Sequence, residues 1–462
     1  MVPNDTQKII VDNASFRDPS GYVVHHNNSI YRIINKNYAN IFEKATETGL
    51  FKKLVDDKML VNFEDSSELE LNDSDIFKII KQEKIKFISF PYEWSFDMLK
   101  DAALMTLEIQ KKCIEFGFSL KDASAYNIQF HNGKPILIDI TSFEEYREEP
   151  WIAYRQFCEH FLGPLALMAK KDVRLSKLLV NYIDGIPLDI VSGIIPKSTF
   201  TNFGLTAHLH AHAKAQKRYE EKKVEKKKLK KIQLLGIISS LRSTIKNLNL
   251  EQKTEWGEYY KDTNYSEEGQ LEKEKIVREF IQNTSSDIII DFGANDGKFS
   301  RIASEKTFVV SIDVDPIAVN KNYNYHNENI ISIIGDLANP SQGIGWNNLE
   351  RPSLLKRIEK NTCLALALIH HLRITFGIPL KKQFELFSSV AKYLIIEFVD
   401  KEDSQIQRLL QNREDVFDDY TEENFEMIVL KYFEMIDSIK IKNSHRKIYL
   451  LKNKTEEFLS KD

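Results

Sequence analysis

The stretch "DIIIDFGANDGKFS", residues 287–300, joins a short apolar run to a polar turn that contains two glycines. Consecutive isoleucines are typical of a buried β-strand, and glycine allows the backbone of the turn to approach a ligand closely. Four similar runs follow, separated by helical segments: "FVVSIDV" (308–314), "NIISIIGD" (329–336), "CLALALI" (363–369) and "YLIIEFV" (393–399). This alternation predicts an α/β domain with a doubly wound parallel sheet. "FEMIDSIKIKNSHRKIYLLKN" (433–453) predicts two antiparallel strands at one edge.

Acidic residues come at the ends of the first three predicted strands, at Asp291, Asp313 and Asp336. A carboxylate after the second strand, about twenty residues beyond a glycine turn, can accept both hydroxyls of a ribose. The GxGxxG pattern of dinucleotide-binding proteins is absent, because the turn has the sequence Gly-Ala-Asn-Asp-Gly. The pattern therefore indicates a nucleoside site of another kind, or a Rossmann-like sheet that holds no cofactor.

The segments "DFGANDG", "SIDVD", "IIGDL" and "LALIHHL" occur in the order found in class I S-adenosylmethionine-dependent methyltransferases. The chain resembles that family over about residues 254–452. The resemblance implies a Rossmann-like fold and S-adenosylmethionine as cofactor. Its methionine part would lie at Asp291, Gly293, Asn295 and Gly297, its ribose at Asp313 and its adenine at Asp336. Asn295 stands where many members of the family have a third glycine.

Methyl transfer to a hydroxyl needs an aligned acceptor and a group that accepts its proton. His370 and His371 follow the fourth predicted strand, and Glu397 lies in the fifth. We expect His371 to be the base, and the alternative is that each histidine only packs at the turn. The aromatic residues of "TEWGEYYKDTNYS" (254–266) are candidates for a lid over the cofactor or for core packing.

A second pattern, "LKDASAYNIQFHNGKPILID" (120–139), lies in the N-terminal half. Asp122, Asn127 and Asp139 have the order in which kinases keep a catalytic base and two magnesium ligands. Residues 85–170 resemble protein and aminoglycoside kinases, which implies an α+β kinase-like domain with ATP and Mg²⁺ as cofactors. "DIT" replaces DFG, and either Arg32 or Lys36 could replace the phosphate-binding lysine. An active kinase, a non-catalytic kinase-like domain and a coincidence of sequence all stay open.

Between the two halves, residues 214–231 contain ten Lys or Arg and three acidic residues, and apolar residues continue at helical spacing to Leu248. One interpretation is a helical linker that packs on a neighbouring domain. Another is a basic amphipathic helix (214–248) that contacts anionic lipid at the membrane periphery. Few aromatic residues are interleaved, which disfavours nucleic acid as a partner. The expected domains are 1–205 (kinase-like), 206–252 (basic helical linker) and 253–462 (methyltransferase).

Composition agrees with an intracellular globular protein. The net charge is −4, and Cys113, Cys158 and Cys363 are far apart, as expected in a reducing compartment. The N-terminus lacks the pattern of a signal peptide, so we expect a cytoplasmic protein. The alternative is a cytoplasmic protein that is peripheral to the inner face of the membrane.

The acceptor is expected to be a glycan, a glycan phosphate or another small hydroxylated molecule. "GIGWNNLERPSLL" (343–355) and "VDKEDSQIQRLL" (399–410) are similar to bacterial methyltransferases related to nodulation host-specificity proteins. Kinase and methyltransferase modules also occur together in enzymes that cap bacterial polysaccharides, in the opposite order. Under this interpretation the N-terminal domain phosphorylates the acceptor, and the alternative is a scaffold or substrate-binding domain.

Overall fold

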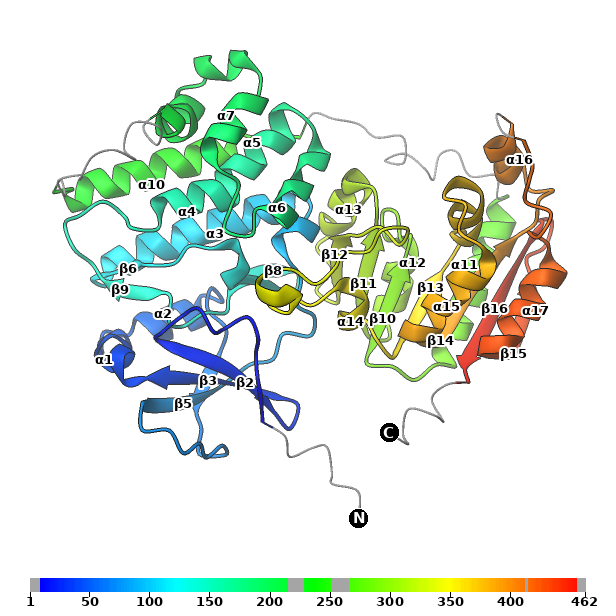
Figure 1. The fold of residues 1–462 in the computed structure, drawn as a ribbon, viewed down its shortest axis with the longest axis horizontal. Coiled ribbons are helices and arrows are strands. Elements are labelled where there is room, and N and C mark those ends of the chain that lie inside the picture. Colours follow the sequence, from blue (N-terminus) through cyan, green and yellow to red (C-terminus); the bar gives the residue numbers. More distant parts are fainter. Residues whose placement is uncertain (1–8, 215–227, 251–265, 412–413, 455–462) are drawn as a thin grey trace. The chain divides into compact units, whose positions relative to one another are not determined.

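The computed structural model describes residues 9–214, 228–250, 266–411 and 414–454. The chain divides into two compact units (Figure 1). Unit 1 comprises Met1–Gln252 together with Ile344–Arg351, and unit 2 comprises Lys253–Gly343 and Pro352–Asp462.

Unit 2 is built on a seven-stranded sheet with the order β12-β11-β10-β13-β14-β16-β15. The first five strands of this order pair in parallel, whereas β16 is antiparallel to both β14 and β15. The strands are β10 (Ile288–Phe292), β11 (Phe308–Asp313), β12 (Ile330–Ile334), β13 (Asn361–Ala365), β14 (Ala391–Val399), β15 (Phe433–Lys440) and β16 (Arg446–Asn453). The predicted doubly wound, Rossmann-like sheet with two antiparallel strands at one edge is therefore confirmed.

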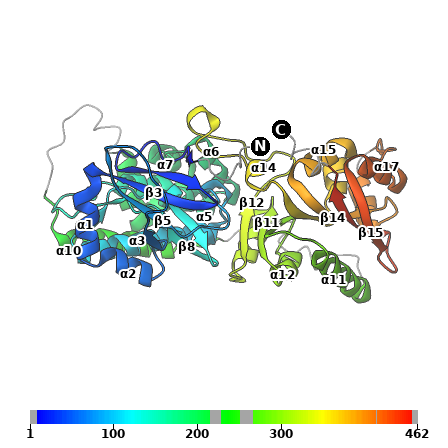
Figure 2. The same ribbon diagram turned by 90° about the horizontal axis from the view of Figure 1, so that it is seen from below.

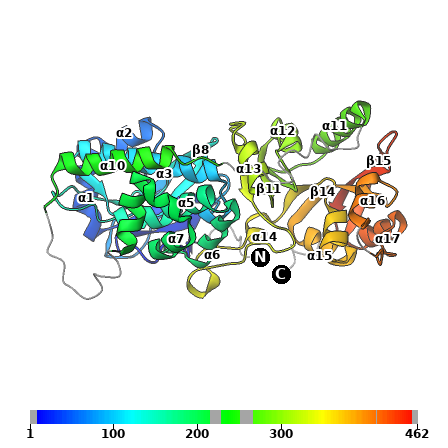
Figure 3. The same ribbon diagram turned by 90° about the horizontal axis from the view of Figure 1, so that it is seen from above.

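Helices cover both faces of this sheet, which is why its central strands are continuous apolar runs. In Figures 2 and 3, α11, α12 and α13 lie on one face, and α14, α15 and α17 lie on the other. The helices are α11 (Glu267–Gln282), α12 (Lys298–Ser304), α13 (Pro316–Tyr323), α14 (Leu354–Arg357), α15 (Leu380–Val390), α16 (Ser404–Leu410) and α17 (Glu422–Tyr432). Buried residues of α11, among them Ile276 and Phe280, join Ile289, Val309 and Ile395 of the strands in one core.

Unit 1 begins with a five-stranded sheet of order β1-β2-β3-β5-β4, drawn in blue in Figure 1. Its strands are β1 (Ile10–Val11), β2 (Gly21–His26), β3 (Ser29–Asn35), β4 (Phe63–Asp65) and β5 (Ile76–Gln82), with α1 (Ala39–Glu47) and α2 (Leu50–Asp56) between β3 and β4. The alternating stretch "GYVVHHNNSIYRII" (21–34) predicts a hairpin that turns at "HNN", and this is confirmed. Asn27 and Asn28 have φ of 48° and 61°, the positive values that a tight two-residue turn needs.

The second part of unit 1 is mainly helical and starts with the long helix α3 (Phe96–Glu115). The helical periodicity of "SFDMLKDAALMTLEIQKKCIEFG" (95–117) predicts this helix. Two short antiparallel pairs follow, β6 (Phe118–Leu120) with β9 (Phe143–Glu145) and β7 (Ile128–His131) with β8 (Lys134–Leu137). The remaining helices are α4 (Tyr154–Phe157), α5 (Gly163–Lys170), α6 (Leu178–Asn181), α7 (Leu188–Ile194), α8 (Phe203–Leu205) and α10 (Lys231–Lys246). The stretch "NIQFHNGKPILID" (127–139) predicts a hairpin that turns at "HNG". The β7–β8 pair confirms it, and its turn residues Asn132 and Gly133 have positive φ.

Residues 206–252, expected as a separate linker, belong to unit 1 where the structure describes them. Helix α10 packs against α3, and its apolar residues Leu234, Ile238, Leu241 and Ile245 are buried. The apolar stripe of this helix therefore faces protein. Among the described residues, no helix has the length and apolar character needed to cross a membrane.

Substitution of Leu241 by Ala should destabilise unit 1 by about 2–5 kcal/mol, because it leaves a cavity under α10. Ile232 lies on the same helix but is 77% exposed, so Ile232→Ala should change stability by about 0.5 kcal/mol or less. Urea unfolding followed by the fluorescence of the buried Trp94 and Trp151 measures both variants. Equal effects of the two substitutions would show that α10 is not docked as described.

Candidate functional site

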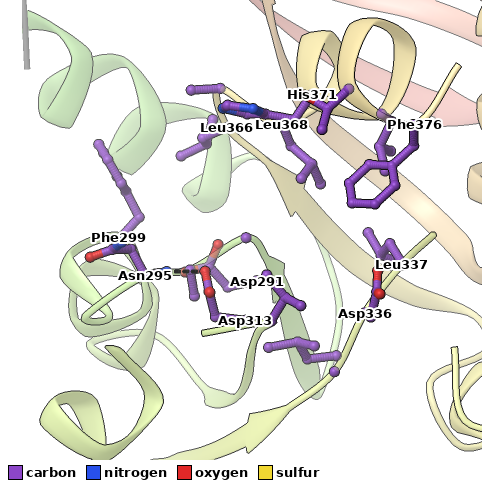
Figure 4. Close-up of a pocket in the computed structure, with 18 of the residues that line it drawn as sticks. Asp291, Asn295, Phe299, Asp313, Asp336, Leu337, Leu366, Leu368, His371 and Phe376 are labelled. Atoms are coloured by element: carbon purple, nitrogen blue, oxygen red, sulfur yellow. Dashed lines mark hydrogen bonds between the residues drawn. The ribbon is translucent and has the colours of Figure 1, made fainter. Parts of the chain in front are cut away.

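A cavity of about 350 Å³ lies in unit 2 at the carboxyl ends of the parallel strands (Figure 4). The chain leaves β10 toward β11 on one side, while β13 pairs on the other side, so the cavity lies where the strand order reverses. Ligands of open α/β sheets bind at this position. The polar lining consists largely of Gln270, Lys273, Asp291, Asn295, Asp313 and Asp336. Leu337, Leu366, Leu368, Leu372, Phe376 and Leu409 contribute much of the apolar lining.

The turn after β10 forms one wall of the cavity and has three residues with positive φ. Gly293, Asn295 and Gly297 have φ of 68°, 51° and 81°. A Cβ at Gly297 would lie 2.0 Å from Oδ1 of Asn322, so this position excludes any side chain. Asparagine enters the left-handed region more readily than most residues, which explains how Asn295 replaces a third glycine.

Asp313 joins the end of β11 to this turn. Its Oδ2 accepts a hydrogen bond from the backbone N–H of Asn295 at 2.8 Å (dashed in Figure 4), and its Oδ1 accepts one from Asp315 at 2.8 Å. These two backbone donors hold the carboxylate of Asp313 at the cavity wall. Burial raises the pKa of this carboxylate to about 6.

The other two predicted carboxylates also line the cavity. Oδ2 of Asp291 accepts a hydrogen bond from Oγ of Ser300 at 2.6 Å, and burial raises the pKa of Asp291 to about 7. Asp336 lies just beyond β12, and its Oδ1 accepts a hydrogen bond from the N–H of Ala338 at 2.8 Å. The structure thus brings together the predicted cofactor residues of three neighbouring strands.

The two histidines do not end a strand, contrary to expectation. Strand β13 stops at Ala365, Ala367 has φ of 52°, and His371 begins a π-helical turn (His371–Thr375). His371 lines the cavity, whereas His370 is buried outside the lining, with its ring centroid 4.3 Å from that of His371. Burial, aided by the positive charge of Arg446, lowers the pKa of His371 to about 4, so its imidazole is neutral near pH 7.

Glu397 is also outside the cavity lining, although it was a candidate for catalysis. It is fully buried, and its Oε2 accepts a hydrogen bond from Nζ of Lys273 at 2.7 Å. Lys273 does line the cavity, and sequence reasoning missed it. A signal was present: Ile276, Val277, Phe280 and Ile281 follow Lys273 at helical spacing, so this lysine lies on the apolar stripe of α11.

In unit 1 the three kinase-like residues lie in one polar cluster. Asp122 accepts hydrogen bonds from the N–H of Ser124 at 2.9 Å and from Gln156 at 2.8 Å, and burial raises its pKa. Asn127 donates to Oγ of Ser142 at 3.2 Å, and Ser142 donates to Oδ2 of Asp139 at 2.6 Å.

Asp139 is engaged by a buried arginine. The guanidinium of Arg32 donates to Oδ1 of Asp139, which also accepts hydrogen bonds from the N–H and the hydroxyl of Thr141. Burial alone would raise the pKa of Asp139, but Arg32 and the hydroxyl donors lower it below its ordinary value. Arg32 and Asp139 are only 7% and 9% exposed, so this is a buried ion pair.

The predicted magnesium site and the predicted aromatic lid both stay predictions. Within the described parts of the chain, no group of three or more His, Cys, Asp or Glu side chains is arranged to hold a metal ion, and Asn127 with Asp139 as magnesium ligands stays a prediction. Trp256, Tyr259, Tyr260 and Tyr265, the candidate lid, lie outside the described residues.

Comparisons with known proteins place this geometry in context. No protein-family model matches the chain. It is 33% identical over 452 residues to the nodulation protein NoeA of Rhizobium meliloti (strain 1021), and the alignment covers 94% of each protein.

Solved structures align with part of the chain. The N-methyltransferase NodS of Bradyrhizobium japonicum WM9, in complex with S-adenosyl-L-homocysteine, aligns over 44% of this chain and 93% of its own, with 9% identity and a TM-score of 0.31. WbdD aligns over 42% of each chain, with 16% identity and a TM-score of 0.30.

Asp291 should make the stability of unit 2 depend on pH. Its pKa is about 7 in the folded protein against an ordinary value of 3.8, so the folded state holds the proton more tightly than the unfolded chain does. The resulting stabilisation is present at low pH and is lost as the pH rises through about 7. Asp291→Asn cannot ionise, and its melting temperature relative to the wild type should rise between pH 5 and pH 8. Thermal unfolding without ligand measures this, with the exposed Asp418→Asn as control, and parallel curves would contradict the assignment.

Proposed function

The chain belongs to the family of the nodulation protein NoeA, and we propose that its unit 2 is an S-adenosylmethionine-dependent methyltransferase that acts on a hydroxylated, glycan-type acceptor. The observation that carries this proposal is the cavity at the strand-order reversal. A turn of three positive-φ residues and the carboxylates of three successive strands meet there.

The residues present fit the cofactor chemically. Its ribose has two adjacent hydroxyls, which a fixed carboxylate such as Asp313 can accept. Its adenine amino group is a hydrogen-bond donor and suits Asp336. Its amino-acid part suits the turn at Gly293–Gly297, of which Gly293, Ala294 and Asn295 line the cavity. Pockets of about 300–1,000 Å³ bind ligands of this size.

When bound, the cofactor supplies an electrophilic methyl group on a sulfonium. His371 lies on the cavity wall, and its neutral imidazole can accept a hydrogen bond from the acceptor hydroxyl and take its proton. Leu337, Leu372 and Phe376 form an apolar wall that would exclude water from this position. His371 thus orients the acceptor and removes its proton, and Glu397 contributes through Lys273.

A glycan acceptor rests on the family membership, because NoeA is a nodulation protein, together with the similarity of residues 343–355 and 399–410 to nodulation host-specificity proteins. We propose O-methylation of a sugar or a sugar phosphate.

For unit 1 we propose a kinase-like module, and two roles are open to it. One is phosphorylation of the acceptor with Asp122 as base and Asn127 and Asp139 on magnesium. The other is a non-catalytic scaffold or substrate-binding module. The buried pair Arg32–Asp139 favours the second role, because a magnesium ion would have to displace a guanidinium from a carboxylate that already accepts four hydrogen bonds.

The proposed cofactor site is tested by titrating the full-length protein with S-adenosyl-L-homocysteine in a calorimeter. The wild type should bind, and Asp313→Asn should weaken binding by about 1–3 kcal/mol, roughly 5- to 150-fold, because a charged hydrogen-bond acceptor is lost. Asn can still accept one of the two backbone N–H groups, so the fold should be retained. Absence of binding to the folded wild type would overturn the function, and unchanged affinity in Asp313→Asn would overturn the assignment of the ribose.

The role of unit 1 is tested by thermal unfolding with ATP and Mg²⁺. A ligand at about 100 times its Kd adds about 2.7 kcal/mol of stability, which corresponds to about 5–10 °C for a unit of this size. The intact Arg32–Asp139 pair leads us to expect no magnesium-dependent rise. A rise that Asp139→Asn removes, and that the exposed Asp65→Asn leaves in place, would instead establish the catalytic role.

A further inference from the structure

Lys273 is a buried cation on the wall of the cavity. It is 3% exposed, and its Nζ lies 4.8 Å from the ring centroid of Phe299, another lining residue. Among the described side chains that line the cavity, Lys273 is the only lysine or arginine, whereas three carboxylates are present. Burial of an ammonium away from water costs free energy unless anionic groups lie close to it.

Glu397 holds this cation in place. Its Oε2 binds Lys273 at 2.7 Å, and its Oε1 lies 3.6 Å from the guanidinium of Arg446. Arg446 in turn forms a two-bond ion pair with Asp403, with its Nε 2.7 Å from Oδ2. Lys273, Glu397, Arg446 and Asp403 therefore form a chain of four buried charges of alternating sign. Each of them is restrained by its neighbours, so Lys273 is fixed on the cavity wall before any ligand arrives.

The sheet determines which end of the cavity Lys273 occupies. Asp336 follows β12, Asp313 ends β11 and Asp291 lies in β10, which is their order across the sheet, and β13 and β14 continue in the same direction. Lys273 binds Glu397 of β14 and interacts electrostatically with Asp291. It therefore lies beyond Asp291, at the end opposite to the proposed adenine and ribose positions.

We propose that Lys273 binds the carboxylate of the cofactor's amino-acid part, with Glu397 as the residue that positions it. This inference rests on the proposed function and adds a residue to that same site. An ammonium has three N–H donors and can share them between Glu397 and a ligand carboxylate. When the adenosine of the ligand is bound by Asp336 and Asp313, its amino-acid part extends past Asp291. The single carboxylate of the ligand then lies next to Lys273. The amino group of the same ligand has Asp291 beside it.

The test compares two ligands that differ only in this carboxylate: S-adenosyl-L-homocysteine and its decarboxylated analogue, which keeps the amino group. Calorimetry on the full-length wild type should give at least about tenfold weaker binding of the analogue. Lys273→Met should weaken S-adenosyl-L-homocysteine at least about tenfold and leave the analogue within about threefold. The matched control is Lys275→Met, an exposed lysine on the same helix, which should alter neither affinity.

Removal of Lys273 leaves Glu397 with fewer partners, so a second variant protects the test against misfolding. Lys273→Met combined with Glu397→Gln removes both charges of the pair and should show the same selective loss. Equal weakening of both ligands in either folded variant would overturn the proposal, as would wild-type affinities within about threefold of each other. That last comparison needs no variant. Failure of the wild type to bind either ligand would overturn the proposed function itself, which is a different result.

Discussion

The position of β10 at the centre of the sheet is the constraint on which unit 2 depends. β10 pairs in parallel with β11 on one side and with β13 on the other. The chain must therefore leave the sheet in opposite directions on the two sides of β10, and a crevice opens between the departing segments. The turn Gly293–Gly297 lies beside this crevice, and its backbone can come close to it because Gly293 and Gly297 lack side chains and, with Asn295, have positive φ.

Buried charge is the second organising feature, and it occurs in both units. Lys273, Glu397, Arg446 and Asp403 alternate in unit 2, and Arg32 pairs with Asp139 in unit 1. Such pairs contribute little net stability, but removal of one partner is strongly destabilising, because the other charge stays buried without compensation. Their main effect is on geometry, because moving a side chain that is held in this way costs free energy. In unit 2 this fixes a cation at the cavity, and in unit 1 it engages Asp139, the carboxylate that was predicted to be a magnesium ligand.

Three titratable groups complete the site in unit 2. The pKa values of Asp291 and Asp313 are raised by burial, and that of His371 is lowered by burial next to Arg446. Each shift favours the uncharged form of the group. Asp313, with a pKa of about 6, is still mostly ionised near pH 7 and can accept the ribose hydroxyls, whereas the neutral His371 leaves Lys273 as the cation that a ligand carboxylate meets.

Local patterns in the sequence were sufficient to predict the sheet, both hairpins, helix α3 and the strand-end positions of Asp291, Asp313 and Asp336. Strand periodicity, turn residues and strand-end positions depend on neighbours within a few residues, and parallel pairing brings strand ends to one edge of the sheet. The sequence also indicated membership of a nodulation-related family, which the similarity to NoeA confirmed. The sequence favoured His371 over His370, and only the tertiary structure showed the unforeseen π-helical turn after β13 that brings His371 into the cavity lining. Tertiary structure alone paired Lys273 with Glu397 and Arg32 with Asp139, residues 124 and 107 positions apart. Those contacts depend on how distant segments pack, and burial then determines which charges must pair.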